Sequence, residues 1–310
     1  MQLSLLGGDG SGRFRSLLFP GNNSADREVV IPSPTEGTDM RVITTLNQKG
    51  GCGKSSCTYH LAGAFASKGL RVLLADMDPQ SSISQGFWGP NDTRALDPEE
   101  TVAALFPGNR PHPSQVIKQT GIPGVDIIPG SRAATRFNTP EPWTAPEESQ
   151  TCLRDLLAEV ADSYDIVLAD CPPNLHLCSW VAMVASDHII IPVQPEDFGA
   201  MGIVDVQESI AMVRAVANPG LNLLGYLLTM VSPRKTLHQA FEETLRSLYG
   251  FDVFEERFLE AIAYAESITK RMPIQQYKPK GAPAKSIIRL ADEIMARMEE
   301  TSFGSRKEVA

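Results

Sequence analysis

The sequence predicts a doubly wound α/β fold, with a mostly parallel central sheet and helices on both of its faces. Segments of strand length that are apolar throughout recur along the chain, which is typical of strands buried on both faces. Helical patterns separate most of these segments, as expected for parallel strands joined by crossover helices. A glycine-rich turn, residues 50–53, joins the first apolar segment to the first helical one.

Six strands and five helices are predicted in the folded part. The strands are Val42–Leu46, Val72–Ala75, Val125–Ile128, Ile166–Ala169, His188–Val193 and Leu221–Leu228. The helices are predicted over 54–68, 151–162, 201–217, 236–249 and 285–300. In the first helix, Cys57, Leu61, Ala64 and Phe65 fall on one face, and Lys68-Gly69 forms a stop signal.

Three segments lack this regular pattern. Residues 1–39 are rich in Gly, Ser, Asn and Pro and are interpreted as a flexible N-terminal extension of a folded domain over 40–300. Residues 301–310 are interpreted as a C-terminal tail. The stretch 90–150 contains ten prolines, so long surface loops are expected there, with one short helix near 97–106.

Composition excludes several classes of protein. No apolar run approaches the length that spans a bilayer, and a cytoplasmic protein is expected. The five cysteines include no C-x-x-C pair, which argues against a disulfide framework or a zinc site. The net charge of −9 argues against a general nucleic-acid binder, so DNA binding requires a local basic surface.

The glycine-rich turn carries the strongest functional signal. The segment reads Lys49, Gly50, Gly51, Cys52, Gly53, Lys54, Ser55 and Ser56. Glycines let backbone N–H groups approach a phosphate, and the following helix N-terminus adds partial positive charge. Lys54 is expected to reach the β- and γ-phosphates and the Ser55 hydroxyl to bind Mg²⁺, so the predicted ligands are ATP and Mg²⁺.

The loop departs from the strict phosphate-loop pattern, because Gln48 stands where its first glycine should be. The pattern K-G-G-x-G-K-[ST] instead resembles the deviant Walker A motif of the ParA/MinD group of ATPases. That resemblance implies a homodimer formed on ATP binding, in which Lys49 contacts the partner subunit's phosphates. Lys49 and Lys54 are therefore expected to act in catalysis.

Two further segments resemble the same group. Residues 73–80 end in Asp76-Met77-Asp78-Pro79-Gln80. The resemblance implies that Asp78 orients or polarises the attacking water and that Asp76 supports the Mg²⁺ shell. Residues 166–173 are similar to a Walker B strand, in which Asp170 holds Mg²⁺ through water. Cys171 stands where the group usually has threonine.

The resemblance extends over about residues 41–300 and includes DNA-binding and base-binding positions. It implies an adenine contact at Met230 and a DNA-contacting arginine at Arg234. The family's I-P-R-N-V-R segment is replaced by Phe258–Ala263, without its proline and arginines. Residues 264–290 nevertheless carry six cations and one acid. The candidate DNA contacts are Arg234, Lys235, Lys270, Arg271, Lys278 and Lys280.

The function that the resemblance implies is ATP-dependent partitioning. An ATP-bound homodimer would bind nonspecific DNA on the nucleoid, and a ParB-like or other small adaptor would stimulate slow hydrolysis and release it. A MinD-like membrane ATPase is the alternative, but the tail offers only Phe303 as a large apolar anchor, so no membrane partner is expected. Iron–sulfur ATPases that share the K-G-G-x-G-K-[ST] loop need cysteines to bind the cluster, and the absence of a C-x-x-C pair here argues against that class. The sequence identifies neither cargo nor adaptor.

Overall fold

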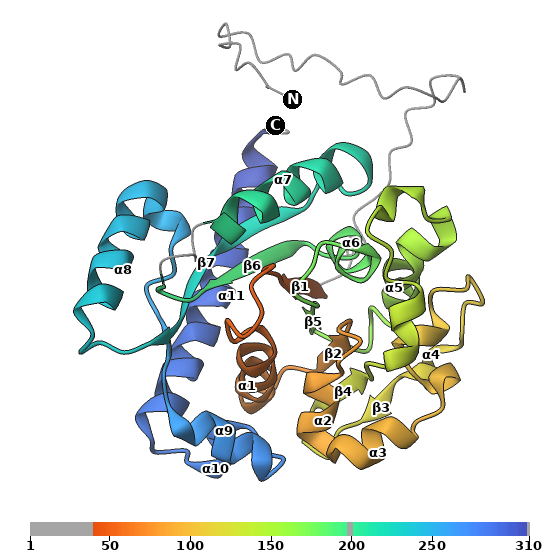
Figure 1. The fold of residues 1–310 in the computed structure, drawn as a ribbon, viewed down its shortest axis with the longest axis horizontal. Coiled ribbons are helices and arrows are strands. Elements are labelled where there is room, and N and C mark those ends of the chain that lie inside the picture. Colours follow the sequence, from red (N-terminus) through yellow and green to blue (C-terminus); the bar gives the residue numbers. More distant parts are fainter. Residues whose placement is uncertain (1–39, 197–200, 309–310) are drawn as a thin grey trace, which may run out of the picture. The chain divides into compact units, whose positions relative to one another are not determined.

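One eight-stranded sheet organises the part of the chain that the computed structural model describes, residues 40–196 and 201–308. Its order is β3-β4-β2-β5-β1-β6-β7-β8, and all pairings are parallel except that of β3 with β4 (Figure 1). The strands are β1 Arg41–Thr45, β2 Val72–Asp76, β3 Lys118–Gln119, β4 Val125–Ile128, β5 Ile166–Asp170, β6 His188–Val193, β7 Asn222–Val231 and β8 Phe258–Leu259.

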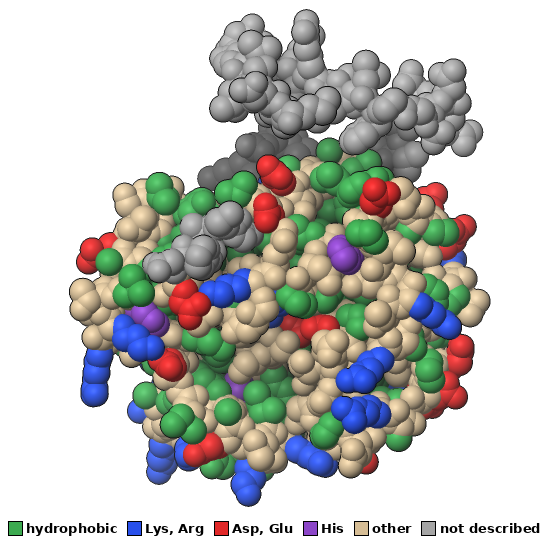
Figure 2. Space-filling model, in the orientation of Figure 1, with side chains coloured by type: hydrophobic (Ala, Val, Ile, Leu, Met, Phe, Trp, Pro, Cys, Tyr) green, Lys and Arg blue, Asp and Glu red, His purple; other side chains and the backbone are tan. Residues whose placement is uncertain are grey.

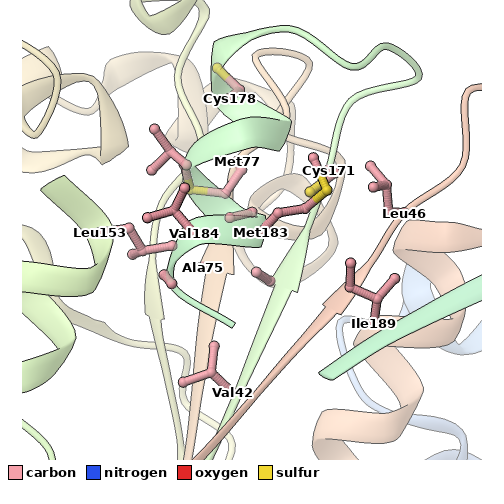
Figure 3. Close-up of a cluster of buried hydrophobic side chains, with 14 of the residues drawn as sticks. Val42, Leu46, Ala75, Met77, Leu153, Cys171, Cys178, Met183, Val184 and Ile189 are labelled. Atoms are coloured by element: carbon pink, nitrogen blue, oxygen red, sulfur yellow. The ribbon is translucent and has the colours of Figure 1, made fainter. Parts of the chain in front are cut away.

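The strands are apolar throughout because both faces of the sheet are covered. Alternate side chains of each strand enter two separate cores, as the two-residue period of a strand requires. Val42, Ala75 and Ile189 enter one core, where they meet α6 (Leu177–Val184). Figure 3 shows side chains from the strands and from α6 gathered between sheet and helix. Ile43, Leu74 and Ile190 enter the other core.

Helices on the two faces supply the rest of these cores (Figure 1). On the α6 side lie α5 (Glu147–Glu159) and α7 (Met201–Val216). On the other side lie α1 (Lys54–Ser67) and α11 (Ala282–Glu308). The remaining α-helices are α2 Ser82–Trp88, α3 Pro90–Ala95, α4 Pro113–Val116, α8 Thr236–Tyr249, α9 Ile262–Thr269 and α10 Ile274–Tyr277.

The predicted fold class and all six predicted strands are confirmed. The prediction missed α6, which is buried all round and therefore shows no amphipathic period. It also missed β3 and β8, which are two residues long. Helix α5 begins earlier than the predicted 151–162, and α11 extends beyond 285–300 at both ends.

The expectation of long surface loops over 90–150 was wrong in part. Residues 102–106 are buried in the α6-side core, and the region contains several short helical turns. The expected helix near 97–106 is two 3₁₀ turns, Pro98–Glu100 and Val102–Ala104. Prolines suit this arrangement because the first residue of a helical turn needs no N–H donor, and Pro90, Pro98, Pro113 and Pro142 stand there.

Parts of the prediction fall outside the described residues. These are the N-terminal extension 1–39, residues 197–200, and the end of the tail at 309–310. Among the helices that the structure does describe, none is long and apolar enough to span a bilayer.

Candidate nucleotide-binding site

The glycine-rich turn leaves the carboxyl end of β1 and leads directly into α1, as predicted. Gly51 and Gly53 have φ values of 75° and 87°, in the left-handed region that glycine adopts without strain. At Gly50 and Gly51 a Cβ atom would meet nothing within 4 Å, so this part of the loop faces open space. The Thr229 hydroxyl donates to the Cys52 carbonyl at 2.7 Å and ties the loop to β7. The loop is thus fixed at its base and open at its tip.

The two lysines of the loop have different surroundings. Lys54 is buried, and its Nζ donates to the Lys49 carbonyl at 3.0 Å. That contact holds the ammonium group inside the curve of the loop. The Lys49 side chain is 26% exposed and pairs with Glu196 at 2.5 Å. Lys49 therefore lies partly at the surface, whereas Lys54 is enclosed by its own loop.

Two buried carboxylates stand at the ends of neighbouring strands, since Asp76 and Asp170 are register partners on β2 and β5. Asp170 Oδ2 accepts a hydrogen bond from the Ser55 hydroxyl at 2.5 Å. Asp76 Oδ2 accepts from the Ser84 hydroxyl at 2.6 Å and from its N–H at 3.0 Å. In each carboxylate the Oδ1 atom is buried and has no hydrogen-bond partner among the described residues.

Burial shapes the charge of this carboxylate pair. Desolvation raises the pKa of Asp76 to about 7, against the lowering effect of its Ser84 hydrogen bonds. Desolvation and the neighbouring Asp76 raise the pKa of Asp170 well above its ordinary value. Two carboxylates this close and this buried favour a bound cation that would neutralise them.

Asp78 lies on the loop that follows β2 and faces the same space as the glycine-rich turn. It is 8% exposed, and its Oδ1 accepts from the Gln80 N–H at 2.8 Å. Burial raises its pKa. A pocket of about 280 Å³ brings it together with most of the predicted nucleotide contacts. The lining residues are Gly50, Gly51, Gly53, Lys54, Ser55, Ser56, Asp78, Ser82, Pro173 and Met230.

These residues fit a magnesium-bound nucleotide. The unpartnered Oδ1 atom of Asp170 and the hydroxyl of Ser55 are oxygen donors, which Mg²⁺ prefers. The open glycine turn presents N–H groups, and Lys54 supplies the positive charge that a polyphosphate requires. Met230 lies close to Gly53, at the side of the pocket. Cys52 and Cys171 are both fully buried, which agrees with packing rather than with exposed reactive thiols.

The sequence did not indicate two residues that support Asp76. The Ser84 hydroxyl donates to Asp76 and accepts from the Gly130 N–H at 2.9 Å. Gly130 is required there because a Cβ atom would stand 2.7 Å from the Asp76 carboxyl carbon. Neither residue belongs to a motif, and only the fold brings them together. Asp76 itself does not line the pocket.

The predicted DNA contacts are less uniform than the nucleotide contacts. Lys278 pairs with Glu266 at 2.7 Å, and Lys235 pairs with Glu260 at 3.1 Å. The Arg271 guanidinium lies against Gly89. Within residues 40–196 and 201–308, the structure shows no carboxylate paired with the remaining candidates, Arg234, Lys270 and Lys280.

Comparison with known proteins agrees with this geometry. A family model described as an AAA domain matches residues 40–223. The chromosome partitioning protein ParA of Caulobacter vibrioides is 32% identical over 83% of this chain and 95% of its own. The chromosome-partitioning ATPase Soj of Thermus thermophilus is 33% identical over 84% and 98%. A Mycobacterium smegmatis cobyrinic acid a,c-diamide synthase, solved with an ATP analogue and magnesium, shares the fold, with a TM-score of 0.69. It is 23% identical and covers 84% of this chain and 96% of its own.

By its parallel sheet and its glycine-rich loop, the chain is a nucleotide-binding protein of the P-loop class. More particularly, the matched family model and the relatives above 30% identity show that it belongs to the ParA/Soj family of partitioning ATPases.

Proposed function

We propose that this partitioning ATPase, over residues 40–300, works as a nucleotide-gated homodimer on nonspecific DNA. ATP and Mg²⁺ are its cofactors. The observation that carries the proposal is the placement of Lys49. Its side chain does not line its own nucleotide pocket but pairs at the surface with Glu196, where exchange of that partner for a second subunit's nucleotide is proposed.

Each site residue has a role that its surroundings support. Lys54 and the N–H groups of Gly50–Gly53 hold the phosphates, while Ser55 and Asp170 hold Mg²⁺, with Asp76 behind them. The metal supplies charge neutralisation at the phosphates when it is bound. Asp78 lines the pocket, and in this proposal it orients a water molecule for attack. Met230 contacts the base side of the nucleotide.

Nucleotide occupancy then governs the partners. ATP joins two subunits across Lys49, and the dimer presents the cations around 234–235 and 270–280 to DNA phosphates without reading sequence. A ParB-like or other small adaptor stimulates slow hydrolysis and releases the dimer. In the cell, this cycle would keep the protein in the cytoplasm, on the nucleoid.

DNA retention tests the mechanism, measured with ATP, ADP and no nucleotide across a salt series. The expected result is retention that requires ATP and weakens steeply with salt. Lys49→Gln should still bind nucleotide, because Lys54 is intact, but should lose ATP-dependent dimerisation and DNA retention. Lys68→Gln is the matched control, since Lys68 lies at the far end of α1 and pairs with Asp292. Equal DNA retention with ATP, with ADP and without nucleotide would contradict the proposed mechanism.

A further inference from the structure

A second pocket, of about 240 Å³, lies beside the nucleotide site and is not used by the proposed function. One wall is the segment 80–85, which follows Asp78. The turn 130–133, which follows β4, also lines it, as do α3 and the residues after it. Arg94 and Arg132 both line this pocket.

These two arginines differ from most others in the described part of the chain. Arg71, Arg246 and Arg257, for example, each pair with a carboxylate. Arg94 and Arg132 have no ion pair or side-chain hydrogen bond within residues 40–196 and 201–308. Figure 2 shows Lys and Arg side chains gathered low on the right of this face, over the region of α2 and α3. Two guanidinium groups without a carboxylate partner, both on the lining of one pocket, are suited to bind an anion.

The surroundings favour the carboxylate of a peptide over a nucleic-acid backbone. Leu96, Pro98 and Ala133 add apolar surface that a side chain can pack against. Asp92, Asp97 and Glu99 are exposed on α3 and the turn after it, and they would repel a polyanion. A peptide that places one acidic residue in the pocket and basic residues beside it would satisfy both sets of charges.

The pocket is connected to the nucleotide site by hydrogen bonds. The Gln80 N–H donates to Asp78, and the Gln85 side chain donates to the Gln80 carbonyl at 2.6 Å. On the other wall, the Gly130 N–H donates to Ser84, which in turn donates to Asp76. A ligand in the pocket would therefore contact the segment, 80–85, that is hydrogen-bonded to both carboxylates.

We infer that this pocket is the docking site of a partner protein's peptide, which inserts an acidic side chain between Arg94 and Arg132. The inference rests on the proposed function, since it gives the adaptor a place beside the hydrolytic site. Any change in nucleotide affinity that the peptide causes is matched by an equal change in peptide affinity that the nucleotide causes.

A peptide-display selection tests this inference on the full chain loaded with a nonhydrolysable ATP analogue and Mg²⁺. A random library of 12-residue peptides is selected on the protein and counter-selected on the double variant R94Q/R132Q. The enriched peptides should carry an Asp or Glu. They should lose at least tenfold in affinity when that acid becomes Asn or Gln, and at least tenfold on R94Q/R132Q. Arg136→Gln is the matched control, because Arg136 is on the same 3₁₀ turn as Arg132 but does not line the pocket.

Three results would overturn the inference. The first is the absence of any enriched peptide that depends on the two arginines, and the second is enrichment of peptides without an acid. The third is a tenfold loss of DNA retention on R94Q/R132Q without any effect on peptides, which would make the pocket a nucleic-acid contact. Nucleotide affinity and ATP-dependent dimerisation are measured in parallel. If the unmodified chain neither binds nucleotide nor dimerises with ATP, the proposed function is wrong. If it does both but no peptide binds through the two arginines, only the inference about the pocket is wrong.

Discussion

The nucleotide pocket and the basic segment 270–280 are both charged, but they are built in opposite ways. Lys54 and Asp78 line the pocket, and Asp170 is bonded to Ser55 on its lining; all three are buried and have defined hydrogen-bond partners. In the basic segment, Lys270, Lys278 and Lys280 are exposed on the surface. A buried charge therefore acts through its exact position. An exposed charge acts through the net charge of the surface around it, which neighbouring acids reduce.

Lys54→Ala should have the largest effect, because it removes the only buried ammonium group among the described residues that line the pocket. We expect the rate of ATP hydrolysis to fall on the order of 100-fold or more. The rate is measured by phosphate release, with nucleotide binding followed separately. Lys280→Ala serves as the control, and an equal loss in both variants would show that the buried charge is not special.

His60 connects the two regions and gives the next largest effect. Its Nδ1 accepts the Ile274 N–H at 3.2 Å, and its carbonyl accepts from the Gln275 side chain, so α1 holds the base of the basic segment. Burial lowers the pKa of His60 from 6.5 to about 3. Between these pH values the unfolded chain takes up a proton that the folded chain does not, so the free energy of unfolding falls as pH falls.

Because of this difference in protonation, we expect the free energy of unfolding to be about 2 kcal/mol lower at pH 5 than at pH 7. Urea unfolding across that range measures it. In His60→Asn, which keeps a hydrogen-bond acceptor, the pH dependence should become shallower, whereas His112→Asn on the surface should leave it as it is. Unchanged pH dependence in His60→Asn would show that the histidine does not remain neutral in the folded state.

DNA retention by the basic segment should either weaken or strengthen, depending on whether a substitution removes a cation or an acid. Lys280→Gln should weaken DNA retention and reduce the slope of log affinity against log salt by about 1. Glu266→Gln should strengthen retention, because it releases Lys278 from its ion pair. Filter retention of duplex DNA with ATP, over a salt series, distinguishes the two. If neither substitution moves the salt slope, DNA does not bind at this segment.

The smallest effect is expected for the partly exposed ion pair between Lys49 and Glu196, at the loop that forms the nucleotide pocket. Glu196 holds Lys49 within its own subunit, and both side chains are partly exposed, so the pair contributes little free energy. Glu196→Gln should free Lys49 and favour ATP-dependent dimerisation by up to about fivefold. Sedimentation at a series of ATP concentrations measures this. A weaker dimer would mean that Glu196 itself belongs to the interface.

The same contrast explains how much of the molecule could be predicted from sequence. The strands and the grouping of the candidate site residues around the glycine turn were predictable because each is a short local pattern: an apolar run, a glycine turn, or a carboxylate at a strand end. Ser84 and Gly130 were not, because only the fold brings them to Asp76. Helix α6 was missed because a helix buried all round has no periodic pattern.

The net charge of the basic surface was the hardest feature to predict, because a count of charges along the sequence does not include acids that are close only in the folded structure. Over 264–290 the sequence shows a single acid, yet Arg289 pairs with Glu256. Lys235, which the prediction added to this surface, pairs with Glu260. Both acids lie before the counted window. The patch is therefore less positive than its composition indicates.

The central position of β1 has a consequence for how the chain folds. This strand is the first to be synthesised in the domain, but both of its neighbours, β5 and β6, begin more than 100 residues later (Figure 1). Pairing between such distant segments requires the closure of long loops, which makes folding slow. During synthesis β1 therefore stays unpaired until β5, which ends at Asp170, has left the ribosome, and it gains its second neighbour only when β6, which ends at Val193, follows. The most conspicuous motif in the sequence belongs to a part of the molecule that takes its final form late.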